Sequence, residues 1–227
     1  NYAVSEMNGF VGGGIRIKYS IANFINVVII GNSSFTWGGG LHAEGSVINL
    51  TNVIISENFS QNGGGGLLLI ESNAIITNVT ITKNVTDNSY YGGGAIALYN
   101  AETTFANVII WDNIPILNHI VDGHLNIKYS DIQGGWEGDG NIDADPLFTD
   151  PGHGDYTLQP ISPCIDAGTA DIDGDGVYEI TDYFGSAPDM GAYEFNPTTQ
   201  DCEISLGDVN LDGVLDILDI LQIVNII

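Results

Sequence analysis

Two stretches of this chain carry oxygen-bearing residues at the spacing that a divalent cation needs. From Asp208, ligands fall at positions 1, 3, 5, 9 and 12 of a twelve-residue window, and a backbone carbonyl is available at position 7. The set is Asp208, Asn210, Asp212, Val214, Asp216 and Asp219. Gly213 occupies position 6, where a calcium loop turns sharply. Ca²⁺ prefers carboxylate, amide and carbonyl oxygens, so this segment predicts a calcium loop.

The second stretch begins at Asp171 and repeats these offsets. Its candidate ligands are Asp171, Asp173, Asp175, Val177, Glu179 and Asp182, with Gly176 at position 6. The five carboxylates would repel one another without a cation between them, which favours a second Ca²⁺ site. The alternative is a solvated acidic hairpin, because no helical pattern flanks this loop.

Charge narrows the range of partners. The sequence has 4 Lys and Arg residues against 29 Asp and Glu residues, a formal charge of −25. Four scattered cations cannot form the basic surface that nucleic acid or an anionic membrane requires. No run of 18 apolar residues occurs, so we expect no membrane insertion. Most of the carboxylates lie after residue 130, which again indicates hard cations as partners.

The elements that position these loops follow from an internal repeat. Four segments align, namely FINVVIIGN from Phe24, LTNVIISEN from Leu50, ITNVTITKN from Ile76 and FANVIIWDN from Phe105. A glycine triplet precedes each one, and the period is 26, 26 and then 28 or 29 residues. β-Branched residues alternate within each unit, which is a strand pattern, and the period leaves no room for a helix. The sequence therefore predicts an all-β, right-handed parallel β-helix.

Asparagines recur at two positions of each repeat. The first series is Asn26, Asn52, Asn78 and Asn107, and the second is Asn32, Asn58, Asn84 and Asn113. Equivalent residues of successive coils stack in a solenoid, so we interpret both series as structural asparagine ladders rather than as ligands. A degenerate fifth coil is expected at residues 124–135, with Ser130 in the asparagine place. The Asp- and Gly-rich segment after it should cover the end of the coils.

Two resemblances to known families extend this reading. The stretch DADPLFTDPGHGDYTLQPISPCIDAG from Asp143, followed by PDMGAYEF from Pro188, resembles the bacterial parallel β-helix proteins with choice-of-anchor Q domains. The segment GDVNLDGVLDILDILQIVNII from Gly207 resembles the first half of a type I dockerin, with its EF-hand-like loop and helix. These resemblances imply an extracellular or cell-surface protein of bacterial-type secretion, and a cohesin-like protein as a partner.

Catalytic residues are not evident. A uronate lyase needs a base and a cation, and the repeats supply only Arg16, Lys18, Lys83 and Lys128. Arg16 and Lys18 read as outward residues of a strand. The acidic residues of the repeats occupy different coil positions, so no pair converges. The histidines, namely His42, His119, His124 and His153, lack metal-ligand spacing and are expected as single surface or corner residues.

The resulting prediction has four parts. Residues 1–137 form coils of a β-helix that is incomplete at its N-terminus, 138–196 a cap, 197–206 a linker, and 207–227 a partial dockerin. Cys164 and Cys202 form a disulfide or remain two free thiols. We expect a calcium-binding surface module that binds carbohydrate, a cohesin-like protein, or copies of itself end to end. The alternative is a fragment of a polysaccharide lyase or glycosidase whose active site lies in missing coils.

Overall fold

The computed structural model describes residues 2–3, 13–87, 92–116 and 119–197. The chain divides into a unit of Asn1–Phe195 and a second unit of Asn196–Ile227. The dockerin-like segment at 207–227 lies outside the described residues, as do residues 198–206 of the predicted linker.

Three parallel sheets build this unit. One contains β2 (Ile15–Lys18), β6 (Leu41–Glu44), β9 (Leu67–Ile70), β12 (Ile96–Tyr99) and β14 (His119–Val121). The next contains β3 (Ile21–Ile25), β7 (Val47–Ser56), β10 (Asn73–Thr82), β13 (Glu102–Trp111) and β15 (His124–Lys128), with β4 (Val28–Ile30) paired to β7 and β16 (Asp131–Ile132) to β13. The last contains β1 (Tyr2–Ala3), β5 (Ser33–Ser34), β8 (Phe59–Ser60) and β11 (Val85–Thr86).

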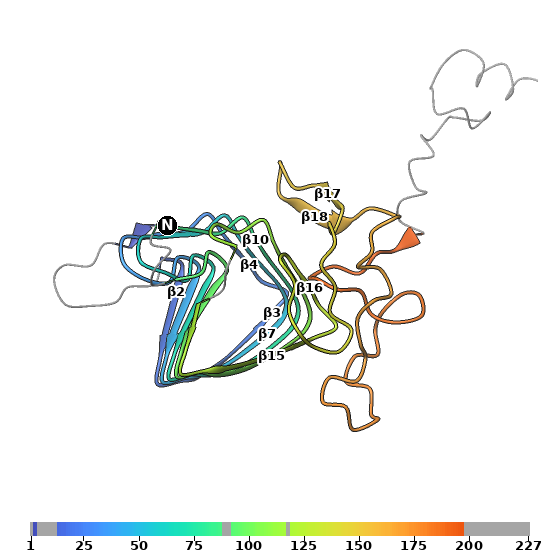
Figure 1. Ribbon diagram of the computed structural model, residues 1–227, viewed down its shortest axis with the longest axis horizontal. Coiled ribbons are helices and arrows are strands. Elements are labelled where there is room, and N and C mark those ends of the chain that lie inside the picture. Colours follow the sequence, from blue (N-terminus) through green and yellow to red (C-terminus); the bar gives the residue numbers. More distant parts are fainter. Residues whose placement is uncertain (1, 4–12, 88–91, 117–118, 198–227) are drawn as a thin grey trace, which may run out of the picture. The chain divides into compact units, whose positions relative to one another are not determined.

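The pairing register confirms the repeat. Leu41 pairs with Ile15 and with Leu67, steps of 26 residues each, and Leu67 pairs with Ile96, a step of 29. Equivalent strands of successive coils therefore pair in the same sheet, and the coils stack in parallel as a β-solenoid of about four turns (Figure 1). Apolar side chains fill the interior, and Leu50, Ile76 and Phe105 are fully buried there.

The first asparagine series forms a corner of every coil. Asn26, Asn52, Asn78 and Asn107 have φ between 53° and 56°, the left-handed region that asparagine tolerates better than most residues. Each therefore bends its coil in the middle of the second sheet. In the fifth coil this place belongs to Tyr129 (φ 48°), because Ile109 pairs with Asp131. The expectation for Ser130 was wrong by one residue, since Ala106 pairs with Lys128 and Ile109 with Asp131, which places Tyr129 opposite Asn107.

The second asparagine series runs inside the stack. Asn58 Nδ2 donates to Asn84 Oδ1 (2.9 Å), and Asn84 Nδ2 donates to Asn113 Oδ1 (3.0 Å). The same oxygens accept backbone N–H groups, as when Asn58 N donates to Asn84 Oδ1 (3.0 Å). The ladder thus satisfies buried backbone groups at a corner where sheet pairing is interrupted, as the sequence predicted.

The glycine triplets are required by close contact between coils. A Cβ on Gly39 would lie 2.4 Å from the carbonyl oxygen of Gly65 and 2.4 Å from that of Phe59. Both neighbours are backbone atoms of rigid strands or turns, so they cannot move aside. These segments are tight structural crossings, which agrees with the sequence interpretation.

The segment after the coils does not only close their end. Residues 136–142 do so: Ile142 pairs with Asp131, and Asn141 Oδ1 accepts Ser130 N (3.0 Å). The remainder, including the hairpin of β17 (Phe148–Asp150) and β18 (Asp155–Leu158), packs on the outer face of the second sheet (Figure 1). A second apolar core lies in that contact, formed by Ile54, Ile109, Phe148, Tyr156, Leu158, Cys164, Met190 and Ala192.

This segment packs on the outer face of the second sheet for a physical reason. Ile54 and Ile109 point outward from β7 and β13, and they would expose apolar surface without a cover. Ala192 N donates to Thr80 Oγ1 (3.0 Å), and Gly191 N donates to the backbone oxygen of Asn107 (2.9 Å), which ties the cap to β10 and β13. We call residues 138–195 the cap.

Candidate functional site

The acidic loop at residues 171–179 is closed by backbone contacts. The carbonyl of Ala170 accepts N–H groups from Glu179 (2.9 Å) and Ile180 (3.1 Å), so the chain returns to its starting point. Both carboxylate oxygens of Asp171 accept backbone N–H groups, from Gly174 (2.6 Å) and Gly176 (2.9 Å). Gly174 and Gly176 have φ of 82° and 89°, a conformation that side chains disfavour.

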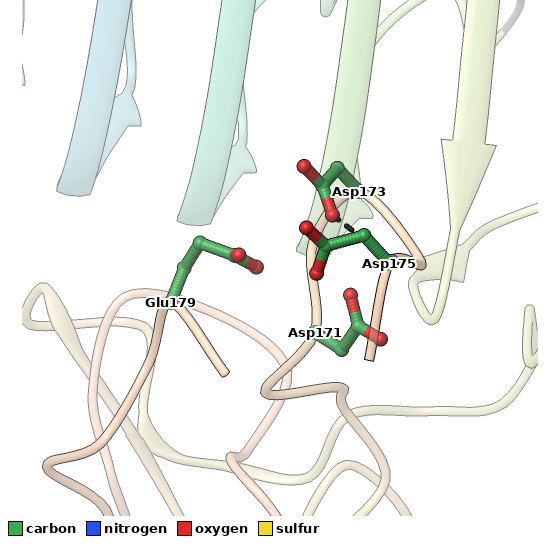
Figure 2. Close-up of side chains that lie close together, drawn as sticks. All are labelled: Asp171, Asp173, Asp175 and Glu179. Carbon is green, nitrogen blue, oxygen red and sulfur yellow. Dashed lines mark hydrogen bonds between the residues drawn. The ribbon is translucent and has the colours of Figure 1, made fainter. Parts of the chain in front are cut away.

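Four carboxylates converge inside this loop. One ligand oxygen from each of Asp171, Asp173, Asp175 and Glu179 lies within 4.8 Å of the others (Figure 2). Two oxygens on opposite sides of a Ca²⁺ ion, each bound at about 2.4 Å, are about 4.8 Å apart. The all-oxygen donor set and its dimensions therefore fit a calcium ion.

The other two predicted members of this site stand apart from the group. Asp182 is exposed and is not among the four carboxylates that converge, so its position-12 role stays a prediction. Val177 is 61% exposed, and its N–H donates to Asp175 Oδ1 (2.8 Å).

No Lys or Arg compensates this charge from within the loop. The four basic residues of the sequence lie at 16, 18, 83 and 128. Arg16 and Lys18 both approach Glu44, with N–O distances of 3.7 and 2.8 Å. The Nζ atom of Lys83 donates to the Pro151 carbonyl.

Two further predicted features involve residues beyond the description. The dockerin-like ligands at 208–219 lie outside the described residues, and so does Cys202. Cys164 is fully buried, its Sγ donates to Asp131 Oδ2 (3.3 Å), and whether it forms a disulfide with Cys202 or remains a thiol is still a prediction. Burial raises the pKa of Asp131 to about 6, and burial also raises that of the Cys164 thiol.

The three motifs behind the choice-of-anchor resemblance meet in the cap. Ser162 Oγ donates to the Pro146 carbonyl (2.6 Å), joining SPCIDAG to DPLF. Asp189 Oδ1 accepts the N–H of Asp166 (2.8 Å), joining DMGAYE to SPCIDAG. Asp189 is itself buried, which raises its pKa. These residues therefore hold the irregular cap together.

A cleft of about 420 Å³ lies between the cap and the first asparagine ladder. Asn26, Asn52 and Asn78 line one side, and the cap contributes Asp182, Phe184, Tyr193 and Glu194. The Oε1 atom of Glu194 accepts the N–H of Asp189 (3.0 Å), whereas its Oε2 atom is buried with no hydrogen-bond partner in the described part of the chain. Burial raises the pKa of Glu194 to about 7.

The histidine prediction was wrong for His42. This side chain is fully buried in β6, and both of its ring nitrogens are buried without a partner among the described residues. Burial, with a smaller effect of Arg16, lowers the pKa of His42 to about 4. His42 alternates with the core residues Leu41 and Ala43 and so points away from the interior, but the preceding turn covers it, with Gly38 against its Cβ.

Sequence reasoning did not find the cleft or Glu194. The sequence pattern places Asp182 in a metal loop and Glu194 in the PDMGAYEF motif, and neither pattern indicates a cleft. The first asparagine series was the one sequence signal for the cleft, because a row of stacked side-chain amides on the outside of the coils needs hydrogen-bond partners from elsewhere in the chain or from a ligand.

Comparisons with known proteins provide no family assignment. No family model matches the chain, no curated protein is similar enough to match, and no solved structure matches. Among the described residues, no helix is long and apolar enough to cross a membrane.

Proposed function

We propose that this chain is a calcium-binding, non-catalytic β-solenoid that works outside the cell as a binding or assembly module. The observation that carries the proposal is the convergence of Asp171, Asp173, Asp175 and Glu179 within 4.8 Å. Four carboxylates so close are costly without a cation, and their oxygens match the ligands of Ca²⁺. The ion holds the loop closed and thereby stabilises the cap.

The finer parts of the proposal rest on the sequence. A right-handed coil is the hand that parallel crossovers favour. The resemblances to choice-of-anchor Q proteins and to a dockerin support a secreted or surface-bound protein that attaches to a cohesin-like partner. The loop from Asp208 supplies a second calcium site. The exposed apolar residues of the first described coil, such as Ile21 and Ile25, support association with a further coil or a second copy.

Calorimetric titration of the calcium-free chain with CaCl₂ tests the proposal. We expect two sites per chain. Asp173→Asn together with Asp175→Asn should remove one, because two of the four carboxylates lose their charge, and Asp212→Asn should remove the other. Glu137→Gln is the matched control, since Glu137 is exposed and lies outside the loop. A wild-type chain that takes up no calcium, or a cap-loop double variant with unchanged stoichiometry, would refute the cap site.

A further inference from the structure

The cleft between the cap and the first asparagine ladder has a built set of hydrogen-bonding groups. At Asn107, the next residue of the ladder, the cap itself makes hydrogen bonds to a ladder amide. Asn107 Oδ1 accepts the N–H of Thr169 (2.7 Å), and Asn107 Nδ2 donates to the carbonyl of the same residue (2.9 Å). Asn107 Nδ2 also donates to Asn78 Oδ1 (3.0 Å), so both of its amide hydrogens are engaged.

The earlier rungs keep one amide hydrogen for another acceptor. Asn78 Nδ2 donates to Asn52 Oδ1 (3.2 Å), and Asn52 Nδ2 donates to Asn26 Oδ1 (3.1 Å). Among the contacts of the described residues, each of these two amides donates this one side-chain hydrogen bond, whereas an amide nitrogen carries two hydrogens. At Asn107 the second Nδ2 hydrogen is donated to the Thr169 carbonyl. At Asn52 and Asn78, which line the cleft, the corresponding hydrogen can be donated to a ligand oxygen.

The opposite wall adds aromatic and carboxyl groups. Phe184 and Tyr193 are 48% and 43% exposed, although an aromatic ring is normally covered. Glu194 brings a buried oxygen without a partner, a costly arrangement unless a ligand completes it. Its raised pKa, about 7, lets the carboxyl group act as a donor as well as an acceptor near neutral pH.

We propose that this cleft binds a neutral carbohydrate, with sugar hydroxyls on the Asn26–Asn52–Asn78 amides and on the Glu194 carboxyl group, and with a sugar ring against Tyr193. Hydroxyl groups both donate and accept, so they match amides and carboxyls together, and the apolar face of a sugar ring packs on an exposed aromatic side chain. The inference rests on the binding function proposed above and names its ligand class and site.

Charge decides against an acidic sugar. No Lys or Arg lines the cleft, Asp182 and Glu194 do, and the chain as a whole carries a formal charge of −25. A uronate would meet only carboxylates and amides. A neutral oligosaccharide has no such penalty.

Titration calorimetry with neutral tetrasaccharides of β-linked glucose, xylose, mannose and N-acetylglucosamine tests this site, with tetragalacturonate and a lysine tetrapeptide as charged probes. At least one neutral probe should bind. Tyr193→Ala should weaken it roughly tenfold, because it removes the stacking surface. Tyr178→Ala is the matched control, since Tyr178 is 63% exposed on the acidic loop and does not line the cleft.

A second pair of variants tests the ladder. Asn26→Asp keeps the oxygen that accepts from Asn52 but loses the amide donor and adds a charge, so it should weaken sugar binding. Asn23→Asp is the control, because Asn23 is an exposed asparagine that accepts from Asn49 (2.7 Å) in the same way and lies outside the cleft. Circular dichroism of each variant verifies that the β-solenoid is intact.

The possible results separate cleanly. Binding of no neutral probe, binding of only a charged probe, or neutral-sugar binding that Tyr193→Ala and Asn26→Asp leave unchanged would each overturn the cleft assignment. Calcium uptake is measured on the same samples. Sugar binding without calcium uptake would refute the calcium site and leave the cleft standing, and calcium uptake without sugar binding would do the reverse.

Discussion

The substitution Asn84→Ala is the sharpest test of how the coils are held together. Asn84 is fully buried in the middle of the inner ladder. Its side chain makes five polar contacts: Oδ1 accepts from Asn58 N and Asn58 Nδ2, and the two hydrogens of Nδ2 are shared among Ile55 O, Thr82 O and Asn113 Oδ1. Truncation to alanine removes all five contacts and leaves an unfilled space.

The size of the effect follows from what is left behind. The backbone N–H of Asn58 loses its acceptor inside the stack, where water does not reach it, and the side-chain Nδ2 of Asn58 keeps only the Ile29 carbonyl (2.8 Å) as an acceptor. Each buried group left without a partner costs about 1–3 kcal/mol, so we expect a loss of about 3–5 kcal/mol in the free energy of unfolding.

The assay is guanidinium denaturation followed by circular dichroism, with Asn49→Ala as the matched control. Asn49 also stacks on an asparagine of the neighbouring coil, but through one exposed hydrogen bond to Asn23 (2.7 Å). Its loss should cost no more than about 0.5 kcal/mol. Equal effects of the two substitutions, or a loss below about 1 kcal/mol for Asn84→Ala, would contradict the structural role of the inner ladder.

Two further substitutions test close packing and burial. Gly39→Ala places a Cβ 2.4 Å from two backbone oxygens and should lower the free energy of unfolding by about 3 kcal/mol. Gly152→Ala is the control and should be nearly neutral, because its Cβ would meet only Asp150 Oδ1 at 3.4 Å. Comparable melting temperatures of the two variants would refute the packing argument. His42→Leu removes a buried imidazole whose pKa is lowered to about 4, so the folded state stays neutral while the unfolded chain takes up a proton below about pH 6.5. Wild-type stability should therefore fall, relative to this variant, by about 3 kcal/mol in denaturant titrations as pH decreases from about 6.5 to 4. A gap that does not change with pH would contradict the assigned burial.

The sequence was sufficient for the coils because every constraint there repeats. Asn52, Asn78 and Asn107 occupy the same corner, and a residue that must adopt a left-handed backbone and stack on its neighbour leaves a visible period. The repeat did not predict the corner residue of the fifth coil, because this coil is shorter and a tyrosine, Tyr129, takes the asparagine place.

The cap could not be derived in this way because it does not repeat. Its position on the flank depends on Ile54 and Ile109, which sequence alternation marks as outward residues and which only a cover from elsewhere in the chain would bury. His42 shows the same limit, since its burial comes from turns and not from its own strand. The convergence of Asp171, Asp173, Asp175 and Glu179 is predictable because these carboxylates lie within nine residues, whereas the role of Asp182 stays a prediction.

Thermal unfolding of the chain in 1 mM CaCl₂ and in excess chelator is the most direct test of the calcium-bound cap. A ligand present at about one hundred times its dissociation constant stabilises the folded state by about 2.7 kcal/mol, which is about 5–10 °C for a domain of this size. We predict a decrease of that order on chelation, absent from the Asp173→Asn, Asp175→Asn double variant. The same melting temperature with and without calcium would contradict the proposal that this loop is a metal site.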